Sequence, residues 1–174
     1  MKKQYKLVIR LAVLLLIIII LLLDFNKPLK GKVDYIVVNK NKRELLVFNK
    51  NNMLLKEYNI ALGFEPKGKK EVQGDGKTPE GTYYINDKNP NSIAYKNLGI
   101  SYPNSADIQN SKLLGKPAGG DIKIHGLMKK WNMFGSLHRF IDWTGGCIAV
   151  GNSEIDELYK NVPMGTKIII NPWL

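Results

Sequence analysis

The sequence predicts one mainly-β domain with one or two short helices, carried on an N-terminal membrane anchor. Three observations support this prediction. The chain has 174 residues, which is enough for one domain and not comfortably for two. From residue 33 onward, short stretches of alternating apolar and polar residues are separated by polar turns. Residues 1–24 instead combine a basic start with a continuous apolar run.

The basic and apolar N-terminal stretch predicts a cytoplasmic stub and a transmembrane signal anchor over residues 1–24. No polar residue interrupts the run from Leu11 to Leu23. A cleaved signal peptide would share this pattern, but Asp24–Lys27 lacks the small residues of a cleavage site, so an uncleaved anchor is favoured. No cysteine lies near the run, which excludes a lipoprotein. Because the positive charge precedes the apolar run, the rest of the chain is expected on the extracytoplasmic side of the cell membrane.

The remaining chain divides into a polar linker, residues 25–32, and a globular domain, residues 33–174. The whole chain has a formal net charge of +11, which favours polyanionic partners. Outside the cytoplasm this makes anionic wall polymers or lipid headgroups candidates and argues against nucleic acid. A lysine-rich surface can also serve solubility alone.

Strands and helices are expected in a definite order. The first three strands follow one another with tight turns, which favours an antiparallel start. A glycine- and lysine-rich loop spans Gly63–Gly81, and Asn89–Ser92 is expected to end the fourth strand. We expect strands at 33–38, 43–48, 53–62, 82–86, 121–125, 146–150 and 166–171, and an extended piece at 99–103.

Two short helices are also expected. One covers residues 104–114, with Asn104 or Ser105 as its N-cap. The other begins at Ser153, with Asp156 completing a variant capping box. Its apolar face consists of Ile155, Leu158 and Tyr159.

Neither a nucleotide site nor a metal site is expected. The segment Gly63–Lys70 resembles a phosphate-binding loop, but a lysine stands where that loop needs a hydroxyl residue for Mg²⁺. One cysteine and two histidines do not form a recognisable zinc pattern. No cofactor is predicted.

The strongest candidate for chemistry is Cys147, the only cysteine in the chain. A thiol needs a base to become a nucleophilic thiolate at neutral pH. The preceding Thr144-Gly145-Gly146 supplies glycines that let backbone N–H groups turn toward a developing oxyanion. The alternative is a structural thiol buried at the start of a strand.

His125 is the candidate base for this thiol. It ends a strand-like alternation and precedes Gly126, and a neighbouring backbone carbonyl could hold its Nδ1–H and fix the tautomer. A surface or packed histidine is the alternative reading. His138 is the competing base, but its neighbours Lys129, Lys130 and Arg139 suggest a more exposed position.

Several ordered motifs resemble the L,D-transpeptidase (YkuD-type) catalytic domain. That family carries a histidine-glycine pair and, further on, [Ser/Thr]-x-Gly-Cys followed by an apolar pair. The matching elements here are Gly74–Tyr83, Ile100–Asn104, Ile122–Gly126 and Thr144–Ile148. Gly145 stands where many members have histidine, and Ala149 where many have arginine or asparagine.

The resemblance implies a mixed-sheet β-sandwich and a cysteine acyltransferase that acts on peptidoglycan stem peptides. By position, Cys147 would be the nucleophile and His125 the proton donor and acceptor. Thr144, Gly145 and Gly146 would form the oxyanion signature, and Gly126 and Trp143 would contact substrate. The outcome stays open between L,D-transpeptidation and hydrolysis by an L,D-carboxypeptidase or amidase. A non-catalytic wall-binding module is the remaining alternative.

Overall fold

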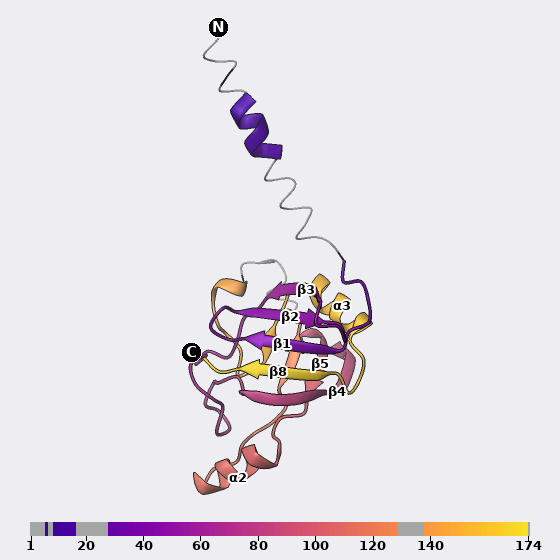
Figure 1. The fold of residues 1–174 in the computed structure, drawn as a ribbon. Coiled ribbons are helices and arrows are strands. Elements are labelled where there is room, and N and C mark those ends of the chain that lie inside the picture. The colour runs from indigo at the N-terminus through magenta and orange to yellow at the C-terminus, as the bar shows by residue number, and fades with distance from the viewer. Residues whose placement is uncertain (1–5, 7–8, 17–27, 129–137, 174) are drawn as a thin grey trace.

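The computed structural model describes residues 6, 9–16, 28–128 and 138–173. Its β domain is built on eight strands in the order β3-β2-β1-β8-β4-β5-β6-β7. Figure 1 shows β3, β2, β1 and β8 side by side, with α3 beside them and α2 projecting below. The strands are β1 Tyr35–Asn39, β2 Glu44–Phe48, β3 Leu54–Asn59, β4 Gly81–Ser92, β5 Tyr95–Ile100, β6 Lys123–His125, β7 Ile148–Ala149 and β8 Lys167–Asn171. The helices are α2 Ser105–Leu113 and α3 Asn152–Asn161.

The sheet is mixed, as expected. The first three strands pair antiparallel, whereas β1 pairs with β8 and β6 with β7 in parallel. The sheet also curls toward closure, because Ala61, just past β3, exchanges both backbone hydrogen bonds with Ala149 of β7. This bridge brings the two ends of the sheet together beside Cys147.

The long strand β4 corrects one expectation. Asn89–Ser92 was predicted to end the fourth strand near residue 86, but β4 continues to Ser92. Its first part pairs with β8 and its second part with β5, with register shifts between Ile85 and Asp87 and between Asn89 and Ser92. Pro90 falls inside the second irregularity, where its missing N–H breaks no regular ladder bond.

The two helices are capped by different means. At α2 the expected Asn104 N-cap is present, with reciprocal hydrogen bonds to Asp107. At α3 the cap is Gly151 rather than Ser153, and Glu154 accepts the Gly151 N–H at 2.7 Å. The helix therefore starts earlier than the Ser153–Asp156 pattern suggested. Its buried residues are Ile155 and Leu158, while Tyr159 is only partly buried.

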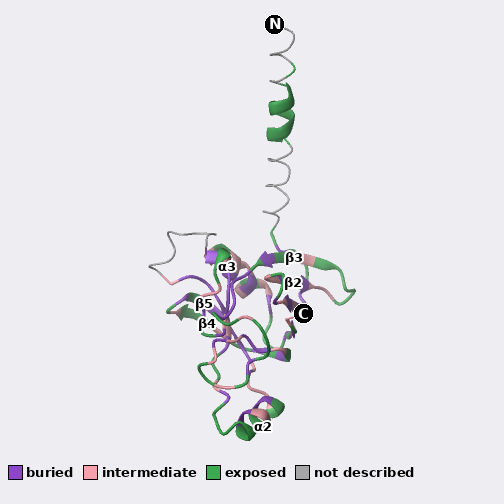
Figure 2. Cartoon of the chain, turned by 90° about the vertical axis from the view of Figure 1, so that its left-hand side faces the viewer, coloured by how far each residue is buried: buried purple, intermediate pink, exposed green. Residues whose placement is uncertain are grey.

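One hydrophobic core lies between the curled strands and α3. Figure 2 shows the buried residues gathered inside the β domain and α2 largely exposed. A lysine also lies in the interior: Lys40 is 0% exposed and donates to the carbonyls of Gly68 and Thr78 and to Glu80. It ties the long loop between Gly63 and Gly81 to β1.

The predicted anchor falls largely on residues outside the described ones. The described residues 9–16 are helical and exposed. Among the described parts of the chain, no helix reaches the length and apolar character needed to cross a membrane. In the predicted linker, Leu29 is 5% exposed and joins the core, so this residue packs against the domain rather than lying in solvent.

Candidate functional site

Strand pairing brings the two candidate catalytic segments side by side. In the parallel β6–β7 pair, His125 lies opposite Ala149, and Ile124 lies opposite Ile148. Continuing this register by one residue places Cys147 opposite Lys123. Side chains alternate along a strand, so residues 123, 125 and 147 lie on the same face of the sheet. The imidazole and the thiol are therefore diagonal neighbours on adjacent strands.

His125 is held in one tautomer by its own backbone. The side chain is 8% exposed, and its Nδ1 lies 2.7 Å from the carbonyl oxygen of Gly126. A carbonyl only accepts hydrogen bonds, so Nδ1 carries the proton and Nε2 keeps its lone pair. Burial lowers the pKa of His125, which keeps the ring neutral and able to accept a proton. Trp143 contacts the ring edge to face, with centroids 5.7 Å apart.

Cys147 is partly exposed, so its sulfur is neither sealed in the core nor fully solvated. Burial raises the pKa of the thiol, although a hydrogen bond from the backbone of Lys123 opposes this. The thiol donates weakly to the carbonyl oxygen of Asp121 at 3.6 Å. The resting pair is thus a neutral thiol beside a neutral imidazole, and the proton must move when substrate arrives.

The loop before Cys147 is fixed by the hydroxyl of Thr144. This hydroxyl accepts the N–H of Gly146 at 3.1 Å and donates to the carbonyl of Cys147 at 2.7 Å. The expected oxyanion donor at Gly146 is therefore engaged by Thr144 in this state. The N–H of Cys147, next along the chain, is the remaining candidate for an oxyanion donor.

The two glycines of the loop have different requirements. Gly146 has φ +132°, and a Cβ there would lie 2.6 Å from the carbonyl oxygen of Lys77. Only glycine fits this position without strain. A Cβ at Gly145 would meet nothing within 4 Å, so that position faces open space. Gly126 is also tightly packed, because a Cβ would lie 2.7 Å from Asn152 Oδ1.

The buried carboxylate of Asp142, which the sequence pattern did not single out, helps to anchor the loop before Cys147. Asp142 accepts hydrogen bonds from Nε and Nη2 of Arg43 at 3.1 and 2.7 Å, and from the N–H of Leu62 at 3.0 Å. Its side chain is 8% exposed. The only available signal was its position directly before Trp143, which did not reveal a partner 99 residues away.

His138 is placed differently from its expected exposed position. It is 8% exposed, and among the described residues neither of its ring nitrogens has a hydrogen-bond partner. Burial, with Arg139 and His125 adding to it, lowers the pKa of His138 to about 4. Its predicted neighbours Lys129 and Lys130 lie outside the described residues. Of the two histidines, His125 has the geometry of a base for Cys147, since it lies diagonally from that residue on the same sheet face of the adjacent strand.

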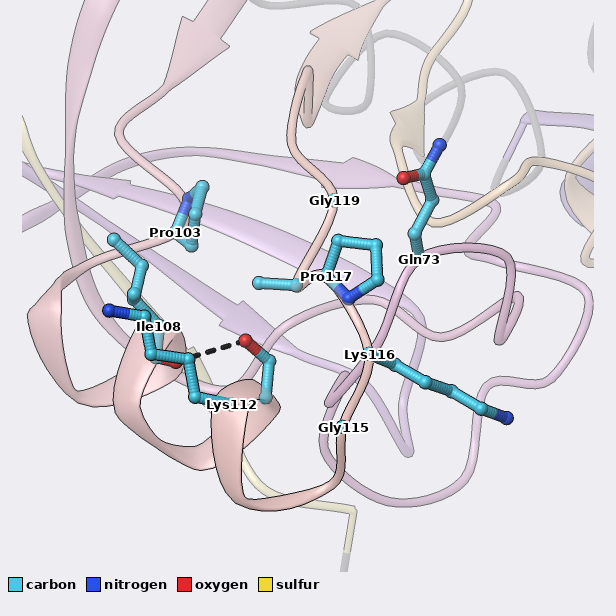
Figure 3. Close-up of a pocket in the computed structure, with 10 residues that line it drawn as sticks. Gln73, Pro103, Ile108, Lys112, Gly115, Lys116, Pro117 and Gly119 are labelled. Carbon is cyan, nitrogen blue, oxygen red and sulfur yellow. Dashed lines mark hydrogen bonds between the residues drawn. The ribbon is translucent and has the colours of Figure 1, made fainter.

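A hollow in the described surface lies away from the Cys147 loop. It has a volume of about 710 Å³ and lies between α2 and the turn that follows it, as Figure 3 shows. None of the predicted site residues lines it.

The sequence model of the L,D-transpeptidase catalytic domain (YkuD) matches residues 33–170. The chain belongs to this family. It is 31% identical over 144 residues to "Putative L,D-transpeptidase YafK" of Escherichia coli, covering 80% of this chain and 51% of that protein. It is 29% identical to "Putative L,D-transpeptidase YqjB" of Bacillus subtilis, covering 83% of this chain and 74% of that protein.

Solved structures agree with this membership. The helical cell shape determining protein Pgp2 from Campylobacter jejuni superposes with a TM-score of 0.61 at 26% identity, over 86% of this chain and 53% of that one. Bd1075 of Bdellovibrio bacteriovorus gives a TM-score of 0.56 at 25% identity, over 80% of this chain and 48% of that one. The chain thus spans about half the length of YafK, Pgp2 and Bd1075. The expected family and its mainly-β mixed sheet are confirmed.

Proposed function

We propose that this domain is a peptidoglycan L,D-transpeptidase with Cys147 as its nucleophile and His125 as its proton acceptor and donor. The observation that carries the proposal is the shared sheet face of these two residues, with the His125 tautomer fixed by Gly126. Family membership supports the same reaction class.

The chemistry begins with two neutral groups. Nε2 of His125 takes the thiol proton as the sulfur attacks the carbonyl between the third stem residue and a terminal D-alanine. The N–H of Cys147 stabilises the oxyanion. The C–N bond breaks, and His125 returns the proton to the departing amine of D-alanine. An acceptor amine then attacks the thioester and gives its proton to His125. The C–S bond breaks, an amide bond remains, and His125 passes the proton to the departing sulfur, which regenerates the thiol.

The proposal also includes the cellular location of the domain. An anchor over residues 1–24 would hold the domain at the outer face of the cell membrane, within reach of stem peptides and anionic wall polymers. Because Pgp2 is named for determining helical cell shape, we extend the proposal to a role in wall architecture and cell shape.

The test uses the full-length chain in detergent micelles and a stem tetrapeptide that ends in D-alanine. Mass spectrometry follows D-alanine release with and without an acceptor peptide. The wild type should form a cross-linked product only with acceptor, and Cys147→Ala and His125→Gln should lose at least about 10³-fold in rate. Tripeptide as the sole product would instead identify an L,D-carboxypeptidase. Unchanged turnover in Cys147→Ala would refute the assignment, and absence of any turnover would favour a wall-binding module.

A further inference from the structure

The sheet face that carries Cys147 and His125 also carries a lysine. Lys123 is opposite Cys147 when the β6–β7 register is continued by one residue, and it precedes His125 by two positions on β6. Its side chain is 28% exposed, so the ammonium lies at the solvent edge of the site. The predicted catalytic pair leaves this cation without a role.

The present partner of Lys123 is a loosely held carboxylate. Oδ1 of Asp121 lies 2.6 Å from the ammonium, but the Asp121 side chain is 82% exposed. Exposed ion pairs of this kind contribute little to stability. The backbone of Asp121 is at φ 60°, and its carbonyl oxygen accepts the Cys147 thiol. Asp121 thus contacts the nucleophile through its backbone carbonyl, while its carboxylate is held by a cation that can exchange it for another carboxylate.

We propose that Lys123 binds the C-terminal carboxylate of the donor peptide, which displaces the side chain of Asp121. This assignment rests on the proposed function. A terminal D-alanine places its carboxylate within about 5 Å of the scissile carbonyl carbon, because only the N and Cα atoms lie between the two carbons. Adjacent strands are about 4.8 Å apart, so a lysine opposite the nucleophile is at the right separation. An ammonium group supplies three donors for such a carboxylate.

Two other readings make different predictions. Lys123 could act only through the thiol, in which case removing it would slow every donor equally. It could instead bind the side-chain carboxylate of a diaminodicarboxylic third residue. Donor peptides that differ only at the terminal group or only at the third residue separate these cases.

The experiment measures kcat and KM for release of the terminal D-alanine, or of its amide, by the full-length chain in detergent micelles. Four tetrapeptides are compared, with a terminal acid or a terminal amide, and with lysine or diaminopimelic acid at the third position. The enzymes are the wild type, Lys123→Met, Asp121→Asn and, as a matched control, Lys116→Met on the exposed turn after α2. Asparagine tolerates the left-handed backbone of residue 121.

We expect the wild type to prefer the acid over the amide by roughly 10- to 100-fold in kcat/KM, mainly through KM. Lys123→Met should lose that preference by slowing only the acid, Asp121→Asn should lower KM for the acid a few-fold, and Lys116→Met should match the wild type. Equal slowing of acid and amide, or an effect that follows the third residue, would overturn the assignment while leaving the proposed function intact. No release from any peptide by the wild type would overturn both.

Discussion

The two segments that form the candidate site are held in place by different forces. His125 lies on β6, between β5 and β7, and its position follows from backbone pairing on both sides. Among the described residues, the loop before Cys147 has backbone bonds only at Thr144, to Leu62 and Phe64, and depends further on side-chain hydrogen bonds from Asp142 and Thr144. The base is therefore fixed by strand pairing alone, whereas the position of the nucleophile also depends on a few replaceable side-chain contacts. Substitutions should therefore affect the cysteine loop more than the histidine strand.

The largest expected effect comes from Gly146→Ala. Its φ of +132° and the 2.6 Å approach to the Lys77 carbonyl leave no room for a Cβ, so the loop must move and carry Cys147 with it. We expect a loss of about 2–4 kcal/mol in the free energy of unfolding and about 100-fold in kcat. Denaturant titration and D-alanine release measure the two quantities.

Gly145→Ala is the matched control for this change, since a Cβ there meets nothing within 4 Å. It should alter stability by less than about 0.5 kcal/mol. If both alanine variants behave alike, the close approach of Gly146 to the Lys77 carbonyl is not what positions Cys147.

The next effect concerns the buried carboxylate. Asp142→Ala removes the acceptor for the Leu62 N–H and leaves Arg43 without its partner. We expect a loss of about 2 kcal/mol in the free energy of unfolding and an about tenfold lower kcat. The reason is that the loop beginning at Trp143 loses one of its attachments. Asp156→Ala, which breaks the more exposed pair with Lys96, should cost under about 1 kcal/mol and leave kcat unchanged. A larger effect at Asp156 would contradict this ranking.

A smaller effect is expected at the loop hydroxyl. Thr144→Val keeps the shape but removes the bridge between the Gly146 N–H and the Cys147 carbonyl. Stability should fall by about 1 kcal/mol and kcat several-fold. Thr144→Ser restores the hydroxyl and should recover most of the lost rate. If the serine variant is as slow as the valine variant, the hydroxyl is not what holds the loop.

The sequence was informative where the structure depends on local pattern. The Asn104 cap, the segment ending in His125 and the glycines before Cys147 could all be located from spacing, and even the carbonyl partner of His125 Nδ1 could be anticipated. The catalytic roles of these residues stay predictions.

Pairings between distant segments could not be read in the same way. Asp142 meets Arg43 across 99 positions, and Lys40 is buried only because the loop after Gly63 folds over it. Both residues are charged and would ordinarily be assigned to the surface. Their burial depends on which strands meet, and that is set by the whole sheet rather than by neighbouring residues.

The smallest expected effect is on the pH dependence of stability, where the two histidines differ. His125 has a carbonyl partner, whereas the buried ring of His138 has none in the described parts of the chain, and burial lowers its pKa to about 4. The unfolded chain binds a proton near pH 6.5, so it takes up more protons than the folded chain between about pH 4 and 6.5, and stability must fall as the pH falls through that window. His138 should account for a loss of about 1 kcal/mol between pH 7.5 and pH 5.5. His138→Phe should remove this share while keeping D-alanine release at pH 7.5, as measured by denaturant titration at both pH values and by the peptide assay. An unchanged pH dependence of stability would show that His138 is not the titrating group, and a loss of activity as large as that of His125→Gln would mean that His138 belongs with the catalytic pair.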